Sequence, residues 1–305
     1  MKLDDTFRAS TRLYDCNPRA IYEGPIKEFL IEHEIPHRKS GPLNVAKATV
    51  GLDITWATQR RPSAVAKEVV HLVNYIEEDN TRINSVAISL LRRLINESKR
   101  MESINIDIEP SFDPVFLNKL CFELITKVPD SGNTPQKISA LLLKNYHIAM
   151  NTGIIVTGEE DRASVTSTTS KKPGDVNEEA PDGTIYKVYE ITVKTFDLAR
   201  IRDSYDCIHI YNENTENDIL EIIVICRPED CPTEMYKSNL HLFMGHFKYQ
   251  DIVYYYWNIY EWMADTLQRM IPQARASFYK DLNTYISHIN TAESVKLKWQ
   301  ALHNN

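Results

Sequence analysis

Several features are missing from this chain, and each absence removes a class of protein. No apolar run approaches the ~18 residues that a membrane-spanning helix needs. The first residues, MKLDDTFRASTRLYD, lack the hydrophobic stretch of a secretory signal. There is no glycine-rich phosphate loop, no G-x-S-x-G motif and no cysteine–histidine nucleophile pattern. We therefore expect a cytoplasmic protein with no membrane partner and without the signatures of those enzyme classes.

Cysteine is scarce and is not arranged in pairs. The five cysteines are odd in number and mostly isolated, which is unlike a disulfide framework. Cys226 and Cys231 flank the sequence RPED, but no second pair follows at the spacing of zinc ligands. We expect free, partly buried thiols.

Positive charge is also in deficit, which by itself argues against a nucleic-acid partner. The formal net charge is −7. However, residues 1–100 carry 16 Lys and Arg against 13 Asp and Glu, so the negative charge lies in the remaining 205 residues. Because local patches decide whether phosphates bind, overall charge does not exclude a nucleic-acid partner.

The first part of the chain has the apolar spacing of helices. Val65, Val69, Leu72 and Ile76 recur at the spacing of one buried helix face. The turn-rich segment PDSGNTP, residues 129–135, is the clearest internal boundary. We expect a mainly helical region over residues 1–133, which contributes DNA contacts or dimerisation, and a second region over residues 134–305.

After a helix that opens at Thr134, the apolar period changes from 3.6 to 2. The segments GIIVTG (153–158), CIHIYN (207–212) and EIIVIC (221–226) are predicted as strands. From residue 247 the pattern returns to helix, and the aromatic stretch YYYWNIYEW (254–262) is interpreted as packed core or a dimer contact. This order of elements predicts an α+β or α/β fold with helical additions.

A hairpin between these elements carries the most informative charges. Asp182-Gly183 is a strong two-residue turn signal. If Pro181 and Thr184 close that turn, Asp175 lies directly across from Glu190, at the ~5 Å separation of opposed side chains. Lys194 shares the face of Glu190 by the two-residue period of a strand. Two such carboxylates repel unless a proton or cation lies between them, and Mg²⁺ is one such cation. The other interpretation is a half-exposed hairpin with solvated charges.

The residues SKKPGDV followed by YEITVK resemble the PD-(D/E)xK nuclease superfamily, and more specifically its type II restriction endonucleases. The resemblance covers roughly residues 134–226. It implies that Asp175 and Glu190 are the metal-binding acids and Lys194 the catalytic lysine. It further implies Mg²⁺-dependent hydrolysis of phosphodiester bonds in double-stranded DNA, a mixed central sheet flanked by helices, and a homodimer.

One position departs from that family pattern. The residue two before the lysine is normally acidic, and here it is Thr192. Either Glu190 replaces the usual acid from one pleat away, or an acid from the following segment does. Asp197 and Asp203 are the alternatives in that segment.

Two groups of residues are candidates for DNA contact. Lys171 and Lys172 directly precede the acidic strand and are placed to touch phosphates. Gln59, Arg60 and Arg61 have the side chains that read adenine and guanine in the major groove. Such residues are also common on ordinary solvated surfaces.

The sequence therefore predicts a Mg²⁺-dependent, site-specific DNA endonuclease. Two alternatives stay open. One is a non-catalytic helical module that binds DNA or protein, and the other is a nuclease that acts on RNA or branched DNA.

Overall fold

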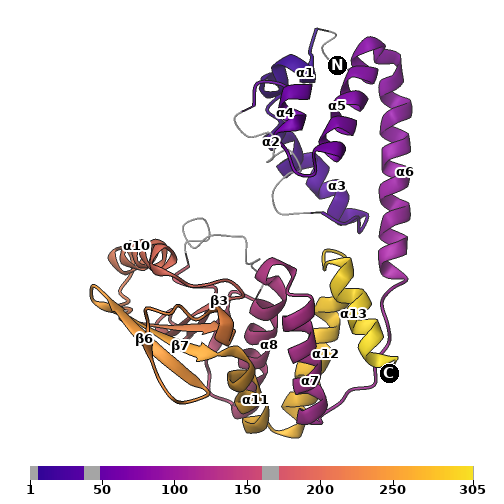
Figure 1. Cartoon of the computed structure of the whole chain (residues 1–305). Helices are drawn as coiled ribbons and strands as arrows, with labels where there is room; N and C mark the ends of the chain where they lie inside the picture. The colour runs from indigo at the N-terminus through magenta and orange to yellow at the C-terminus, as the bar shows by residue number, and fades with distance from the viewer. Residues whose placement is uncertain (1–5, 38–48, 160–171, 305) are drawn as a thin grey trace. The chain divides into compact units, whose positions relative to one another are not determined.

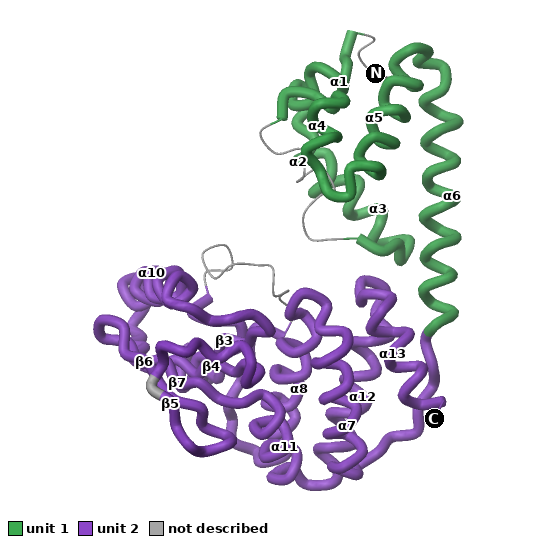
Figure 2. The backbone as a smooth tube through the Cα atoms, viewed as in Figure 1, with its two compact units in different colours: residues 1–104 green, residues 105–305 purple. Residues whose placement is uncertain are grey.

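The computed structural model describes residues 6–37, 49–159 and 172–304. The chain divides into two compact units, residues 1–104 and 105–305 (Figure 2). This division falls earlier than the expected boundary at residues 133 and 134. The reason is that the helix at 114–127 shares one hydrophobic core with the helix that follows it, so the turn-rich segment 129–135 joins two elements of one unit.

Unit 1 is helical, but Val65, Val69 and Leu72, which were predicted to form one buried helix face, are exposed. Its α-helices are α1 (Ala9–Arg12), α2 (Pro18–Ile21), α3 (Lys27–Glu32), α4 (Ile54–Thr58), α5 (Ser63–Glu78) and α6 (Ile83–Glu102). Trp56 of α4 packs against Ala66 and Val70 of α5 in a small core. A second cluster joins Leu30 of α3 to Tyr22 and Ile35.

Unit 2 contains one sheet and six α-helices among the described residues. The helices are α7 (Pro114–Lys127), α8 (Asn133–Met150), α10 (Leu198–Asn214), α11 (Ile259–Arg269), α12 (Pro272–Ser287) and α13 (Glu293–His303). The strands are β1 (Ile155–Thr157), β2 (Val176–Glu179), β3 (Ile185–Thr192), β4 (Glu221–Cys226), β5 (Tyr236–Lys237), β6 (Phe243–Tyr249) and β7 (Ile252–Asn258).

The sheet is mixed, with the strand order β1-β2-β3-β4-β7-β6-β5. The three central strands β3, β4 and β7 run parallel, and the outer neighbours pair antiparallel. Since parallel neighbours need a crossover, α10 connects the end of β3 to the start of β4.

Helices cover both faces of this sheet (Figure 1). On one face, Ile201 and Ile208 of α10 pack against Val188, Val224 and Tyr254. The other face, which includes Tyr189 and Ile191, packs against α7, α8, α11, α12 and α13. The predicted mixed sheet flanked by helices is confirmed.

Two local predictions are wrong. Residues 207–212 form the second half of α10 rather than a strand, because Ile201, Ser204 and Ile208 place a buried stripe at helical spacing. Residues 252–258 form β7 rather than a helix. There Ile252, Tyr254 and Tyr256 are buried at a period of two, and the helical period begins only at Ile259.

The cysteines and the helices also bear on two earlier expectations. All five cysteines are free thiols, and Cys121 and Cys226 are buried. Over the described ranges, none of the helices combines the length and the apolar character needed to span a membrane.

Candidate active site

The hairpin of β2 and β3 has the predicted register. Val176 pairs with Tyr189, and Asn177 pairs with Val188. Extending this register by one residue places Asp175 opposite Glu190. A hydrogen bond is consistent with this placement: Asp175 Oδ2 accepts one of 2.9 Å from the backbone N–H of Ile191, the residue next to Glu190.

The turn itself differs from the prediction. Ala180 N–H donates to Thr184 O at 2.8 Å, and Gly183 N–H donates to Ala180 O at 2.9 Å, so the loop has three residues rather than two. Gly183 has a φ of +90°, a conformation that favours glycine. The pairing shifts by one residue next to the turn, between Glu178 and Glu179. This bulge restores the predicted register at Asp175.

Asp175, the residue directly before β2, is held from two sides. Its carboxylate is bound to β3, as described above. Its backbone carbonyl accepts a hydrogen bond of 3.2 Å from Gln136 Nε2 of α8, a side chain that is 2% exposed. Asp175 remains half-buried, so its position is fixed while part of its surface stays open to solvent.

Glu190 lies inside the sheet on the face that α10 covers, and it is only 6% exposed. Burial raises the pKa of Glu190 well above its usual range, and the neighbouring Asp175 carboxylate raises it further. Arg200 and the hydroxyl of Ser204, both on α10, act in the opposite direction. The net result is a raised pKa, so the site favours a protonated Glu190 unless a cation lies beside the two carboxyl groups.

Thr192, where the family pattern has an acid, is part of a hydrogen-bonded turn. Its Oγ1 accepts a hydrogen bond of 2.6 Å from Arg200 Nη1. It also accepts from Lys194 N–H at 3.0 Å and donates to Lys194 O at 2.9 Å. The hydroxyl thus fixes the backbone that follows β3 and ties it to α10.

Lys194 does not lie on the strand face as predicted. β3 ends at Thr192, so the period of two stops before the lysine, whose side chain is exposed. The segment is nevertheless anchored, because Arg227 Nη2 donates to Val193 O at 3.0 Å and Arg227 Nε contacts Asp230 Oδ2 at 2.6 Å. Lys194 therefore lies on a turn that hydrogen bonds hold in place at the carboxyl end of the parallel strands.

The structure gives the two alternative acids other surroundings. Asp197 caps α10, and its Oδ1 accepts hydrogen bonds of 3.1 Å from both Ala199 N–H and Arg200 N–H. Asp203 is exposed, whereas the buried stripe of α10 runs through Ile201 and Ser204. Neither carboxylate is among the groups that shift the pKa of Glu190.

The candidate DNA contacts are distributed over the chain. Lys171 lies outside the described residues, and Lys172 is half-buried just before the acidic strand. Gln59 and Arg61 are exposed at the end of α4 in unit 1, and Arg60 lies over the Trp56 ring at 5.6 Å. These three residues belong to unit 1, whereas the acids belong to unit 2.

Arg200 and Ser204 are site residues that the sequence analysis missed. They belong to α10, whose second half was predicted as a strand. A cap at Asp197, followed by buried positions 201, 204 and 208, is the signal that would have identified the helix. No sequence signal places that helix over Glu190, because the placement depends on the crossover between β3 and β4.

Oxygen ligands from Asp175 and Glu190 suit Mg²⁺, which is often held by one or two carboxylates together with water and phosphate oxygens. No cluster of three or more His, Cys, Asp or Glu residues at metal-binding distance occurs in the described part of the chain. The two-carboxylate arrangement nevertheless fits this cation.

Comparison with known proteins adds no relative. No protein-family model matches the chain, and no curated protein is significantly similar to it.

Proposed function

We propose that this protein is a Mg²⁺-dependent endonuclease that hydrolyses phosphodiester bonds of double-stranded DNA, in the manner of a type II restriction enzyme. The observation that carries this proposal is the closeness of the two acids: Asp175 accepts a hydrogen bond from Ile191, the residue after Glu190, and its carboxylate raises the pKa of Glu190. A buried carboxyl group beside a second carboxylate is unfavourable unless a cation or a proton accompanies the pair.

The residues divide the chemical work between them. Asp175 and Glu190 would hold Mg²⁺, which when bound neutralises charge on the phosphate oxygens. Lys194 would orient and polarise the attacking water from its turn at the end of β3. Thr192, Arg200 and Arg227 would keep that turn in place through the hydrogen bonds described above. Arg200 also limits the cost of keeping Glu190 ionised.

The fold supports this proposal. The sheet is mixed and has helices on both faces, as a restriction-endonuclease-like core over residues 134–226 would have. Lys194 and Arg227 both follow the carboxyl ends of parallel strands, the edge of a sheet where ligands commonly bind in α/β proteins. Double-stranded DNA, a homodimer and a DNA-contact or dimerisation role for unit 1 belong to the same proposal.

A non-catalytic function is the second candidate, and one observation favours it. Arg200 already supplies a positive charge to Glu190 and donates a hydrogen bond to Thr192. A neutralised, hydrogen-bonded cluster of this kind stabilises a fold without any metal. The protein would then be a module that binds DNA or protein.

A cleavage assay distinguishes the two candidates. Purified protein is incubated with supercoiled plasmid in Mg²⁺ or in EDTA, and the products are resolved on a gel. We expect discrete Mg²⁺-dependent fragments from the wild type and a loss of at least ~100-fold in cleavage rate for Asp175→Ala and Lys194→Ala. Asp206→Ala, which removes an exposed carboxylate of α10, is the matched control and should cut normally.

Other outcomes identify the alternatives. Intact plasmid across a broad panel of DNAs would support the non-catalytic module. Cleavage restricted to RNA or to branched DNA would keep the site but change the substrate. Glu190→Gln, compared with Asp197→Asn and Asp203→Ala, shows which carboxylate is the second metal ligand, and we expect Glu190.

A further inference from the structure

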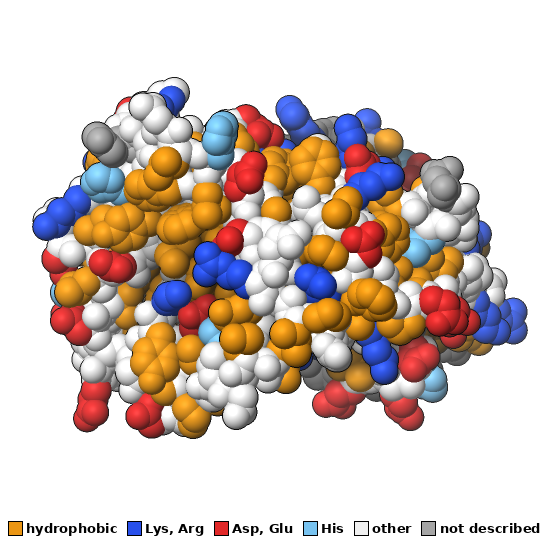
Figure 3. Space-filling view, turned by 90° about the horizontal axis from the view of Figure 1, so that it is seen from below, with side chains coloured by type: hydrophobic (Ala, Val, Ile, Leu, Met, Phe, Trp, Pro, Cys, Tyr) orange, Lys and Arg blue, Asp and Glu red, His pale blue; other side chains and the backbone are white. Residues whose placement is uncertain are grey.

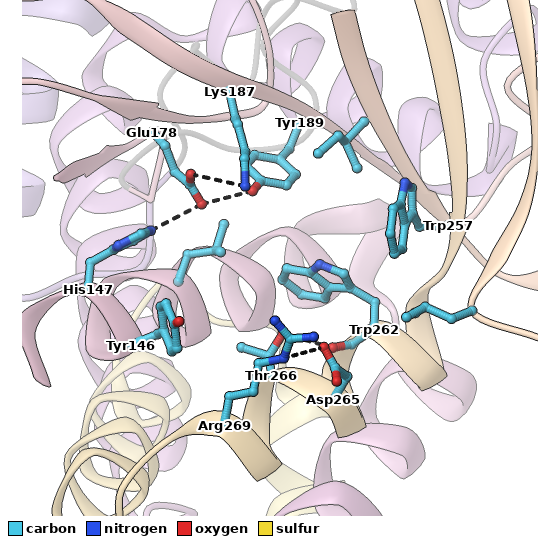
Figure 4. A pocket seen from close by; sticks show the side chains of 13 residues that line it. Tyr146, His147, Glu178, Lys187, Tyr189, Trp257, Trp262, Asp265, Thr266 and Arg269 are labelled. Carbon is cyan, nitrogen blue, oxygen red and sulfur yellow. Dashed lines mark hydrogen bonds and ion pairs between the residues drawn. The ribbon is translucent and has the colours of Figure 1, made fainter. Parts of the chain in front are cut away.

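A pocket of about 300 Å³ lies on the sheet face opposite Asp175 and Glu190 (Figure 4). Glu178 of β2 and Tyr189 of β3 point into it, and side chains of α8, α11 and β7 complete its wall. The two sites are separate, because Glu178 and Tyr189 alternate along their strands with the residues that face α10.

One of the residues that line this pocket is a buried carboxylate. Glu178 is 3% exposed. Its Oε1 accepts a hydrogen bond of 2.8 Å from Tyr189 Oη and lies 3.1 Å from His147 Nε2. Its Oε2 lies 3.9 Å from Lys187 Nζ, which is too long for a hydrogen bond. Oε2 is thus ion-paired with Lys187, but among the described residues no hydrogen bond to it is found, so it can accept one from a ligand.

The Tyr189 phenol is the hydrogen-bond donor in this cluster. Burial and the negative charge of Glu178 raise the pKa of the Tyr189 phenol, so it stays protonated and donates to the carboxylate. His147 is held on its other side, since its Nδ1 lies 2.9 Å from Thr152 Oγ1. Glu178 Oε1 thus accepts the hydrogen bond that Tyr189 donates.

Aromatic rings make up much of the remaining wall. The indoles of Trp257 and Trp262 lie on the β7 and α11 side of the pocket, and the Tyr146 ring lies on the α8 side (Figure 4). Flat rings of this kind bind planar ligands by stacking, with ~1–3 kcal/mol for each stacked nucleobase in proteins that bind single strands.

The charges around the pocket are balanced. Lys187 stands near Glu178, and Arg269 Nε lies 2.9 Å from Asp265 Oδ2. Lys187 and Arg269 are largely exposed, so they lie where the pocket meets solvent. This balance favours a neutral ligand over an organic cation.

Figure 3 shows one face of the protein, seen from below relative to the view of Figure 1. Among the described residues drawn there, Lys and Arg side chains stand beside Asp and Glu and form no continuous basic area. A duplex would find little phosphate attraction on such a face. The paired charges at the pocket itself likewise suit a free small molecule.

We propose that this pocket binds a neutral, planar nitrogen heterocycle with an exocyclic amino group, the chemistry shared by adenine, guanine and cytosine nucleosides. The amino group donates to Glu178 Oε2, and the ring packs against the indoles. Carboxylates accept from such amino groups in base recognition. This inference does not depend on the proposed nuclease activity.

The test compares two nucleosides that differ by the amino group alone. The intact protein is titrated with adenosine and with purine riboside, which lacks that group, by calorimetry and by tryptophan fluorescence. We expect adenosine to bind and purine riboside to bind at least ~10-fold more weakly. Equal affinities would overturn the proposal, and so would the absence of binding by adenosine, guanosine and cytidine at ~1 mM.

Variants locate the site. Glu178→Gln should weaken adenosine binding by at least ~10-fold, because a charged acceptor becomes neutral. Glu179→Gln, the neighbouring acid that does not line the pocket, should bind as the wild type does. Should Glu178→Gln fail to fold, the nucleoside comparison on the wild type still decides. Binding of tetramethylammonium in competition with adenosine, and stronger than adenosine, would instead identify a cation pocket.

Discussion

A buried carboxyl group with a raised pKa makes protein stability depend on pH, and Glu190 is such a group. The unfolded chain has a glutamate pKa of ~4.3. Between that value and the folded pKa, the folded state binds more protons than the unfolded state. The contribution of Glu190 to the free energy of unfolding therefore falls as pH rises through this interval.

The replacement Glu190→Gln removes this dependence. We expect the stability of the variant relative to the wild type to increase from pH 4 to pH 7, as measured by denaturant unfolding at each pH. Added Mg²⁺ should stabilise the wild type at pH 7 and leave the variant unchanged, since a bound cation compensates only an ionised carboxylate. A relative stability that is constant with pH would show that Glu190 is not perturbed.

Lys296 gives a prediction of opposite sign. It is 1% exposed, and its Nζ donates to Asn105 Oδ1 at 2.7 Å and to Ser287 O at 2.8 Å. Burial lowers its pKa to about 8. The folded state therefore loses this proton before the unfolded state does, and the free energy of unfolding rises between pH 8 and the ordinary lysine pKa of ~10.4.

In the variant Lys296→Met, the free energy of unfolding should not rise over this pH interval. The wild type should gain on the order of 2 kcal/mol relative to the variant across this interval. Urea unfolding of both proteins from pH 7.5 to pH 10.5 measures the difference. Parallel pH profiles would show that Lys296 titrates normally.

Among the elements, the hairpin was the most predictable from sequence. Its turn residues and alternating pattern place Asp175 opposite Glu190, and a bulge compensates for the longer loop. β7 and the second half of α10 were not predictable in this way, because short runs of β-branched and aromatic residues suit either a strand or a helix. Arg200 was missed for the same reason.

The cap of α10 carries a prediction at this scale. Asp197→Ala removes the acceptor for two N–H groups and should lower the free energy of unfolding by ~1 kcal/mol. Asp206→Ala, on the exposed side of the same helix, should change stability by less than ~0.5 kcal/mol. Denaturant titrations of both variants give these values. If Asp197→Ala abolished Mg²⁺-dependent cleavage without destabilising the protein, Asp197 would be the second acid.

At the scale of the molecule, each unit has its own hydrophobic clusters. Those of unit 1 lie within residues 1–104, and those of unit 2 within residues 105–305. This division differs from the sequence boundary at 133 and 134, since turn residues mark any break between helices and do not show which helices share a core.

Separate cores predict separate folding. Residues 105–305, expressed alone, should unfold cooperatively and retain the helix and strand content of unit 2, as measured by circular dichroism and calorimetry. Residues 105–305 contain Asp175, Glu190 and Lys194, so any metal binding should persist in this fragment. A fragment without a cooperative transition would show that unit 1 is needed for folding.

The most direct test of the central claim is divalent-metal binding by Asp175 and Glu190. Mn²⁺ substitutes for Mg²⁺, and the electron paramagnetic resonance signal of free Mn²⁺ measures how much is bound. We expect the wild type and Asp206→Ala to bind Mn²⁺ with similar affinity, Mg²⁺ to displace it, and Asp175→Ala and Glu190→Gln to weaken binding by at least ~10-fold. Undiminished binding in both site variants, or no binding by the wild type, would contradict the account.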